Sequence, residues 1–165
     1  MVQIKVFDFD RTLCVHDYVR KNTGDFTYAQ ECGYCLDNRQ FMEEHAKDRP
    51  LACMQWYVKK ALGEADTMLY CVSAEIFSLR DDYKRRFLAQ HYGGMIYMTV
   101  DKPEHKIDLI LELAKHAGVQ ACDCELIDDS LSTVYMANRA GIVGRHISDI
   151  MYEYEMHLRA LGVDL

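Results

Sequence analysis

The sequence lacks the features that define several broad classes of protein. It contains no run of about 18 uncharged apolar residues, which a membrane-spanning helix would need, and it opens on a strand-like segment rather than an export signal. Its seven cysteines are odd in number, and some lie in apolar runs, which is typical of reduced thiols rather than of a disulfide framework. We therefore expect a cytoplasmic protein with no membrane partner.

Positive charge is also scarce. The chain has 19 Lys and Arg against 26 Asp and Glu, a formal net charge of −7. Phosphate backbones reward clustered Lys and Arg, so general nucleic-acid binding is disfavoured, although a phosphorylated substrate needs only a local cation or metal. Low-complexity segments and internal repeats are absent, and half of the 165 residues are hydrophobic. This composition predicts a folded chain of one domain.

Strands and helices alternate along the sequence. Apolar patterns predict strands over 2–7, 67–72, 95–100 and 124–127, with a fifth beginning at 142–143. Helical spacing is found at 51–62, 75–91, 104–116, 130–140 and 147–161. This alternation indicates βαβ units with right-handed crossovers. We expect an α/β fold, a three-layer Rossmann-like domain whose parallel sheet of about five strands has helices on both faces.

The most informative stretch is the run from Ile4 to Thr12, in which Asp8 and Asp10 follow the first predicted strand. Open α/β sheets bind ligands beyond the carboxyl ends of their strands, so carboxylates at this point indicate a site. Later strand ends and helix starts carry further polar groups, namely Ser73, Lys106 and the pair Asp128 and Asp129.

The order and spacing of these groups resemble the four motifs of the haloacid dehalogenase-like (HAD) hydrolases. Those motifs are Asp-x-Asp-x-Thr, a Ser or Thr, a Lys and a terminal acidic pair, and the match spans about residues 2 to 143. The resemblance implies a phosphatase that hydrolyses a phosphate monoester through an aspartyl-phosphate. Asp10 favours phosphatase or phosphomutase chemistry, because dehalogenases of this superfamily lack the second aspartate.

The resemblance also implies a role for each residue. Asp8 would be the nucleophile, and Asp10 would protonate the leaving oxygen and later take a proton from water. Ser73 would donate a hydrogen bond to a phosphate oxygen, and Lys106 would offset negative charge on the nucleophile and the phosphate.

Clustered carboxylates require a cation, and hard oxygen ligands select Mg²⁺. The ligands implied by the resemblance are the Asp8 carboxylate, the Asp10 backbone carbonyl and Asp129, with Asp128 as an auxiliary group.

Several alternatives stay open. Lys102, just before Pro103, competes with Lys106 as the motif lysine, and Ser73 would serve equally as a helix N-cap. Asp129 or Ser130 would likewise cap the helix that follows. The rival functions are a non-catalytic module of the same fold that binds a phosphorylated partner, and a phosphotransferase or phosphomutase.

The segment 14–50 is smaller than most helical cap domains of the superfamily. We expect a single domain over 1–165, with 14–50 acting as a flap or minimal cap that sets substrate choice. Within it, Cys32 and Cys35 have the spacing of half a zinc site, and Cys14 and His16 are the candidates for the other half. A single such pair is a weak signal, and ordinary reduced thiols are the favoured interpretation.

The C-terminal helix carries an apolar stripe that is expected to face the core. If exposed, it would indicate a homodimer contact instead. The stripe consists of Ile147, Ile150, Met151, Tyr154, Leu158 and Leu161.

Overall fold

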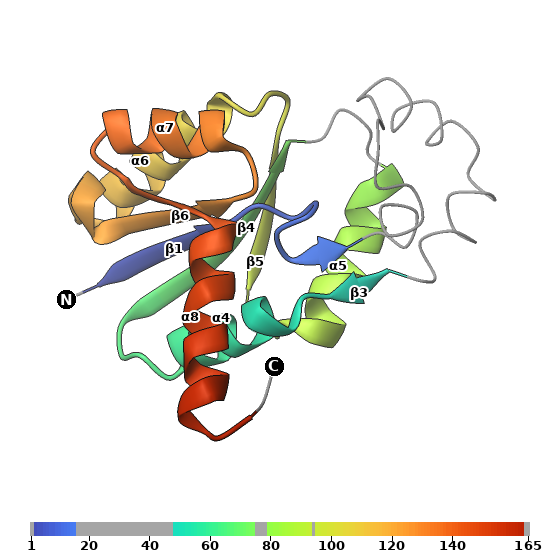
Figure 1. The fold of residues 1–165 in the computed structure, drawn as a ribbon. Coiled ribbons are helices and arrows are strands. Elements are labelled where there is room, and N and C mark those ends of the chain that lie inside the picture. Colours follow the sequence, from blue (N-terminus) through green and yellow to red (C-terminus); the bar gives the residue numbers. More distant parts are fainter. Residues whose placement is uncertain (1, 16–47, 75–78, 94, 164–165) are drawn as a thin grey trace.

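The computed structural model describes residues 2–15, 48–74, 79–93 and 95–163. Its centre is a five-stranded parallel sheet with the strand order β5-β4-β1-β6-β7 (Figure 1). The strands are β1 (Gln3–Phe7), β4 (Thr67–Ala74), β5 (Ile96–Val100), β6 (Cys124–Asp128) and β7 (Val143–His146). The helices are α4 (Ala52–Leu62), α5 (Leu79–His91), α6 (His105–Ala117), α7 (Leu131–Arg139) and α8 (Ile147–Ala160), with a short 3-10 turn η1 (Ala121–Asp123). The predicted three-layer α/β fold is confirmed.

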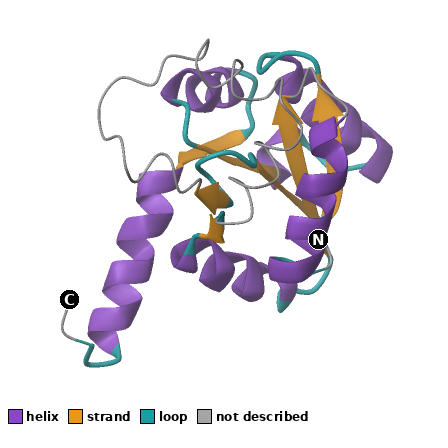
Figure 2. Cartoon of the chain, turned by 90° about the vertical axis from the view of Figure 1, so that its right-hand side faces the viewer, coloured by secondary structure: helices purple, strands orange, loops and turns teal. Residues whose placement is uncertain are grey.

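Alternate residues of the central strands face two separate cores. Ile4 and Val6 of β1 pack with Ile107 and Ile110 of α6 on one face of the sheet. Phe7 of β1 belongs to the other core, which receives apolar residues from α4, α5 and α8. Helices therefore cover both faces (Figures 1 and 2), and Ile4 to Phe7 of β1 are all buried because neither face of this central strand meets water.

The sheet order puts β1 in the middle, between β4 and β6. Phe7 is in register with Cys71 of β4 and Ile127 of β6. All three strands run in the same direction, so the residues that follow them emerge at one edge of the sheet. Asp8, Ser73 and Asp128 are therefore neighbours in space, although the sequence separates them widely.

One small element was not predicted. β2 (Cys14–Val15) and β3 (Arg49–Pro50) pair as a two-stranded antiparallel ribbon. The ribbon joins the two ends of the predicted 14–50 flap. Residues 16–47 lie outside the described residues, so the flap itself stays a prediction.

The apolar stripe of α8 divides into two parts. Ile147 and Ile150 are buried as expected, whereas Met151 and Leu161 are exposed, which contradicts a wholly core-facing stripe. The reason is that α8 extends beyond the body of the described residues toward the C-terminus (Figure 2).

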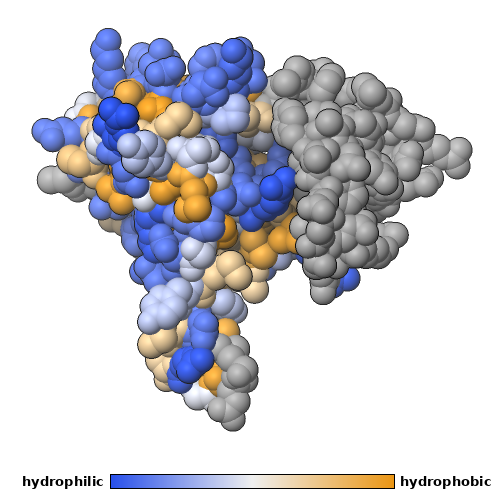
Figure 3. Space-filling model, turned by 45° about the horizontal axis from the view of Figure 1, so that its top comes forward, coloured by the Kyte–Doolittle hydropathy of each residue, from blue (hydrophilic) through white to orange (hydrophobic). Residues whose placement is uncertain are grey.

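In Figure 3 the described surface carries hydrophobic residues in small groups among hydrophilic ones. Among the described residues, none of the helices has the length and apolar character to span a membrane.

Candidate active site

Asp8 is the first residue beyond β1 and sits at the centre of a buried cluster of charges. Its backbone N–H donates to the Ile127 carbonyl oxygen at 2.9 Å, which ties the start of the loop to β6. Its side chain is largely buried, and the Asp8 Oδ1 atom accepts a hydrogen bond from Lys106 Nζ at 2.6 Å. Asp8 is thus a carboxylate held by a fixed cation at the carboxyl end of the central strand.

Lys106 in the first turn of α6 supplies that cation. Its side chain is 3% exposed, and Nζ also donates to Asp128 Oδ2 at 2.8 Å. Lys102, the alternative raised by the sequence, is exposed. The structure therefore brings Lys106 to the aspartates. A lysine near a helix N-terminus opposes the helix dipole, and two carboxylate partners offset that cost.

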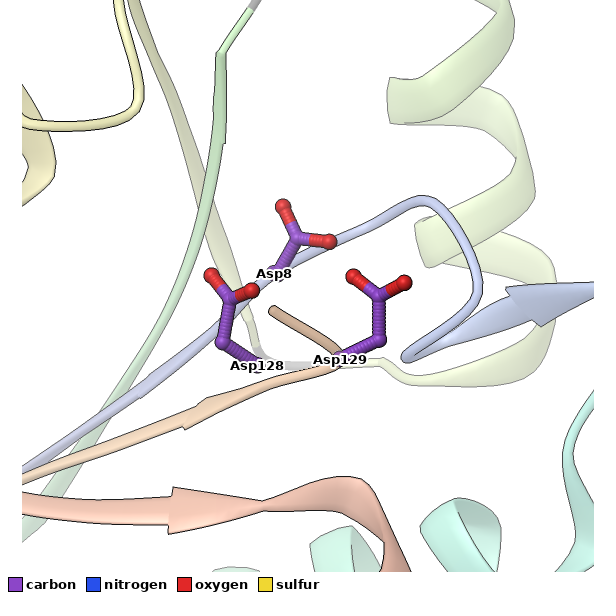
Figure 4. A group of neighbouring side chains, drawn as sticks. All are labelled: Asp8, Asp128 and Asp129. Carbon is purple, nitrogen blue, oxygen red and sulfur yellow. The ribbon is translucent and has the colours of Figure 1, made fainter. Parts of the chain in front are cut away.

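Three carboxylates gather at the ends of β1 and β6. One side-chain oxygen from each of Asp8, Asp128 and Asp129 lies within 4.8 Å of the other two. The three side chains point to the same side of the strand ends (Figure 4). Such a set of hard oxygen donors suits a divalent cation such as Mg²⁺.

The two aspartates of the terminal pair differ in their surroundings. Asp128 is buried, and besides Lys106 its Oδ1 accepts from the Ser130 backbone N–H at 2.8 Å. Asp129 has a side chain that is 26% exposed and lies 3.7 Å from an Arg11 guanidinium nitrogen. Asp128 is the more strongly fixed of the two, whereas Asp129 is partly exposed to solvent.

The loop that carries this pair is held at both ends. Ser130 is the N-cap of α7, because its Oγ accepts from the Thr133 backbone N–H. His146 lies at the start of α8, and its Nε2 donates to the Asp129 carbonyl oxygen at 2.9 Å. Its Nδ1 accepts from the Ser148 backbone N–H. Ser130 is therefore the N-cap of α7, and the Asp129 carboxylate is not used for capping.

The crowding and burial of these carboxylates change the pKa values of the groups in the cluster. The pKa of Asp8 is raised to about 7. Burial is the main cause, and the negative charges of Asp128 and Asp10 act in the same direction, against the opposing effect of Lys106. The pKa of Asp129 is raised by burial and by Asp128, with Arg11 acting in the opposite direction. The pKa of Lys106 is raised because the attraction of Asp8 and Asp128 outweighs its burial. A cation among these carboxylates would favour their charged forms.

Asp10 and Ser73 are joined by a residue that the sequence did not reveal. Lys84 of α5 is 1% exposed, and its Nζ donates to Asp10 Oδ2 and to Ser73 Oγ, each at 2.7 Å. Ser73 itself is fully buried near the end of β4. The only available signal was a lysine beside the apolar positions of a predicted helix, which by itself is unremarkable.

The possible zinc site cannot be assembled from the described residues. Cys14 is buried, its Sγ lies 3.9 Å from the Tyr83 hydroxyl, and burial raises its pKa well above the ordinary value. Cys32, Cys35 and His16 lie outside the described residues, so zinc binding there stays a prediction.

Comparisons with known proteins identify the fold. No family model matches the chain, and no curated protein matches its sequence. Among solved structures, it resembles a HAD-superfamily hydrolase of subfamily IA from Geobacter sulfurreducens PCA. The TM-score is 0.55 at 13% identity, over 86% of this chain and 84% of that one. A phosphoserine phosphatase, solved as an analogue of its phospho-aspartyl intermediate, gives 0.55 at 14% identity over 92% and 98%.

A third similar structure contains a metal. It is the cobalt-bound form of a deoxy-D-mannose-octulosonate 8-phosphate phosphatase from Haemophilus influenzae, with a TM-score of 0.50 at 19% identity over 86% of this chain and 66% of that one. These likenesses show that the chain has the HAD-like hydrolase fold.

Proposed function

We propose that this protein is a Mg²⁺-dependent phosphatase that hydrolyses a phosphate monoester through an aspartyl-phosphate on Asp8. The observation that carries the proposal is the arrangement around Asp8, a buried carboxylate bonded to Lys106 and grouped with Asp128 and Asp129. The fold is shared with phosphatases, one of them solved as a phospho-aspartyl analogue, which supports the same chemistry. The free thiol of buried Cys71 agrees with a cytoplasmic location.

The reaction would run in two displacements. In the first, an Asp8 oxygen attacks phosphorus and the ester P–O bond breaks, while Asp10 gives its proton to the leaving oxygen. In the second, a water oxygen attacks the same phosphorus and passes a proton to Asp10. The bond between phosphorus and the Asp8 oxygen breaks, and inorganic phosphate is released. Lys106 beside Asp8 offsets negative charge in both steps.

The carboxylates around Asp8 fit a bound Mg²⁺. Asp8 and Asp129, with the Asp10 backbone carbonyl, are the proposed ligands, and Asp128 would support them by holding Lys106 and the loop. The pKa values of Asp8 and Asp129 are raised, as expected for clustered carboxylates whose charged forms a bound cation would favour. When bound, the metal would neutralise charge on the phosphate and help to orient it.

Two related functions use the same residues. A phosphotransferase or phosphomutase would pass the phosphoryl group to an alcohol rather than to water. A non-catalytic module would bind a phosphorylated partner without turnover. Asp10 argues against the non-catalytic module, because its carboxylate is held in place by Lys84 where a proton donor and acceptor is needed. Hydrolysis is preferred to phosphotransfer because two of the similar structures are phosphatases.

Hydrolysis of 4-nitrophenyl phosphate tests the proposal. We expect turnover with Mg²⁺, none with a chelator, and none in the Asp8→Asn variant. An active Asp8→Asn variant would refute the role of Asp8. A wild-type protein that binds a phosphate ester tightly but never turns it over would support the binding module.

A further inference from the structure

Lys84 is a buried cation that touches two of the proposed catalytic groups, although neither displacement step needs it to exchange a proton or to contact the phosphate. Its ammonium donates to Asp10 Oδ2 and to Ser73 Oγ, each at 2.7 Å. It also lies over the ring of Phe9, 4.8 Å from the centroid. Lys84 comes from α5, whereas Asp10 follows β1 and Ser73 belongs to β4. The contact therefore links three separate elements at the active-site edge of the sheet.

A contribution to stability does not by itself explain why position 84 carries a buried lysine. Transfer of an ammonium from water to a site that is 1% exposed is costly, and an apolar side chain of similar length would fill the same space without that cost. The neighbours of Lys84 on α5 show the alternative, since Phe87 and Leu88 on the same helix pack in the apolar core. The buried charge thus suggests a task at Asp10 and Ser73.

The direction of the hydrogen bonds indicates the task. An ammonium can only donate, so Ser73 Oγ must accept from Lys84, and the Ser73 O–H then points elsewhere. A phosphate oxygen is the acceptor that the proposed function supplies. At Asp10 the same ammonium holds one carboxylate oxygen. This fixes the orientation of a side chain that is otherwise 36% exposed.

We propose that Lys84 is a positioning residue that aligns Asp10 for proton transfer to the leaving oxygen and sets Ser73 as a donor to the phosphate. This inference rests on the proposed phosphatase function. It assigns to Lys84 no contact with the substrate. The proton that reaches the leaving oxygen still comes from Asp10, as the ester P–O bond breaks.

Leaving groups of different basicity separate this role from a structural one. 4-Nitrophenolate leaves readily as an anion, whereas phenolate depends more on protonation. Because kcat/KM reports the steps up to departure of the leaving group, we expect Lys84→Met to lower kcat/KM for phenyl phosphate about 100-fold, at the lower end of the range of general acid catalysis. The loss for 4-nitrophenyl phosphate should be about tenfold smaller, because the two esters share only the effect through Ser73 on the phosphate.

Two further variants serve as controls. Lys5 is another buried lysine held by two carboxylates, Glu64 at 3.0 Å and Glu125 at 3.7 Å, and it lies outside the site. Lys5→Met should lower stability but change kcat/KM for both esters by the same small factor. Lys84→Arg keeps the cation and should restore most of the activity toward phenyl phosphate.

The outcomes are distinct. An equal fall for both esters in folded Lys84→Met, matching Lys5→Met, would overturn the inference. A wild-type protein that hydrolyses neither ester would instead refute the phosphatase. Binding of beryllium fluoride with Mg²⁺ would then test whether Lys84 positions Ser73. Weaker binding in Lys84→Met than in Lys5→Met would support its action through Ser73, and equal binding would overturn it.

Discussion

Lys106 Nζ lies 2.6 Å from Asp8 Oδ1, although the two residues are 98 positions apart in the sequence. Neither group would be stable alone in this environment, because burial disfavours the charged form of both. Their contact depends on the parallel sheet, which places the residue after β1 next to the first turn of α6. The pair is therefore both a product of the fold and the centre of the proposed chemistry.

Loss of that pair should affect stability and activity together. Lys106→Met leaves Asp8 and Asp128 without their shared cation. We expect a loss of about 3 kcal/mol in the free energy of unfolding at pH 8 and at least a 100-fold fall in kcat. Urea unfolding and ester hydrolysis measure the two effects. Lys102→Met, which changes the exposed alternative, should behave like the wild type. A loss of activity in Lys102→Met with an active Lys106→Met would reverse the assignment.

The raised pKa of Asp8 predicts a pH dependence of stability in metal-free buffer. The folded state binds the proton more tightly, with a pKa of about 7 against an ordinary value of 3.8. The stability due to protonated Asp8 is therefore complete below about pH 4 and is lost as the pH rises through about 7. Asp8→Asn should match the wild type in acid and exceed it at pH 8 by up to about 4 kcal/mol, since one pKa unit corresponds to about 1.4 kcal/mol.

Urea unfolding with a chelator at pH 4, 6 and 8 measures this difference. Asp101 is the matched control, because its pKa is lowered by the hydrogen bond from His105. Asp101→Asn should show no gain at high pH. If Asp8→Asn were also no more stable than the wild type at pH 8, the conclusion that an unfavourable buried negative charge at Asp8 lowers the stability would be wrong.

The two members of the acidic pair should respond differently to loss of charge. Asp129→Asn removes a proposed ligand that is partly exposed, so Mg²⁺ should bind at least about tenfold more weakly with little change in stability. Asp128→Asn removes a buried partner of Lys106 and should mainly lower the stability. Calorimetric titration with Mg²⁺ and urea unfolding separate the two. The opposite pattern would exchange the roles of the two residues.

Arg11 has a left-handed backbone conformation, with φ of 62°, in the loop between Asp10 and Thr12. A side chain with a Cβ is disfavoured there by about 1 kcal/mol, and glycine is not. Arg11→Gly should therefore keep or raise the stability while the contact with Asp129 is lost. Asp66, with φ of 61°, offers the comparison, and Asp66→Gly should change stability less because aspartate tolerates this conformation better. A marked loss of stability in Arg11→Gly would show that the Arg11 side chain outweighs the backbone strain.

The central part of the fold was predictable from the sequence because it depends on long patterns. The apolar run before Asp8 and the helical spacing of residues 104–116 gave β1 and α6 nearly at their observed bounds. The grouping of Asp8 with Lys106 and Asp128 was implied by the resemblance to the HAD hydrolases. The strand order that brings them together came from the structure.

Other features depend on contacts that leave little trace in the sequence. β2 and β3 are two residues each, too short for a periodic pattern. Lys84 belongs to a helix with many charged residues, and only the tertiary structure shows that it is the buried one. Gly144 in β7 is another case. A Cβ there would lie 2.5 Å from the Val134 carbonyl oxygen, a constraint set by the packing of α7.

The most direct test of the account is chemical trapping of the phosphorylated enzyme. The wild-type protein is quenched in acid during turnover of a phosphate ester, treated with borohydride and digested for peptide mass spectrometry. Borohydride reduces an acyl phosphate to an alcohol, so an aspartyl-phosphate becomes homoserine. The account predicts homoserine at Asp8, dependent on both substrate and Mg²⁺. Turnover that leaves Asp8 unmodified while another residue is reduced would contradict it.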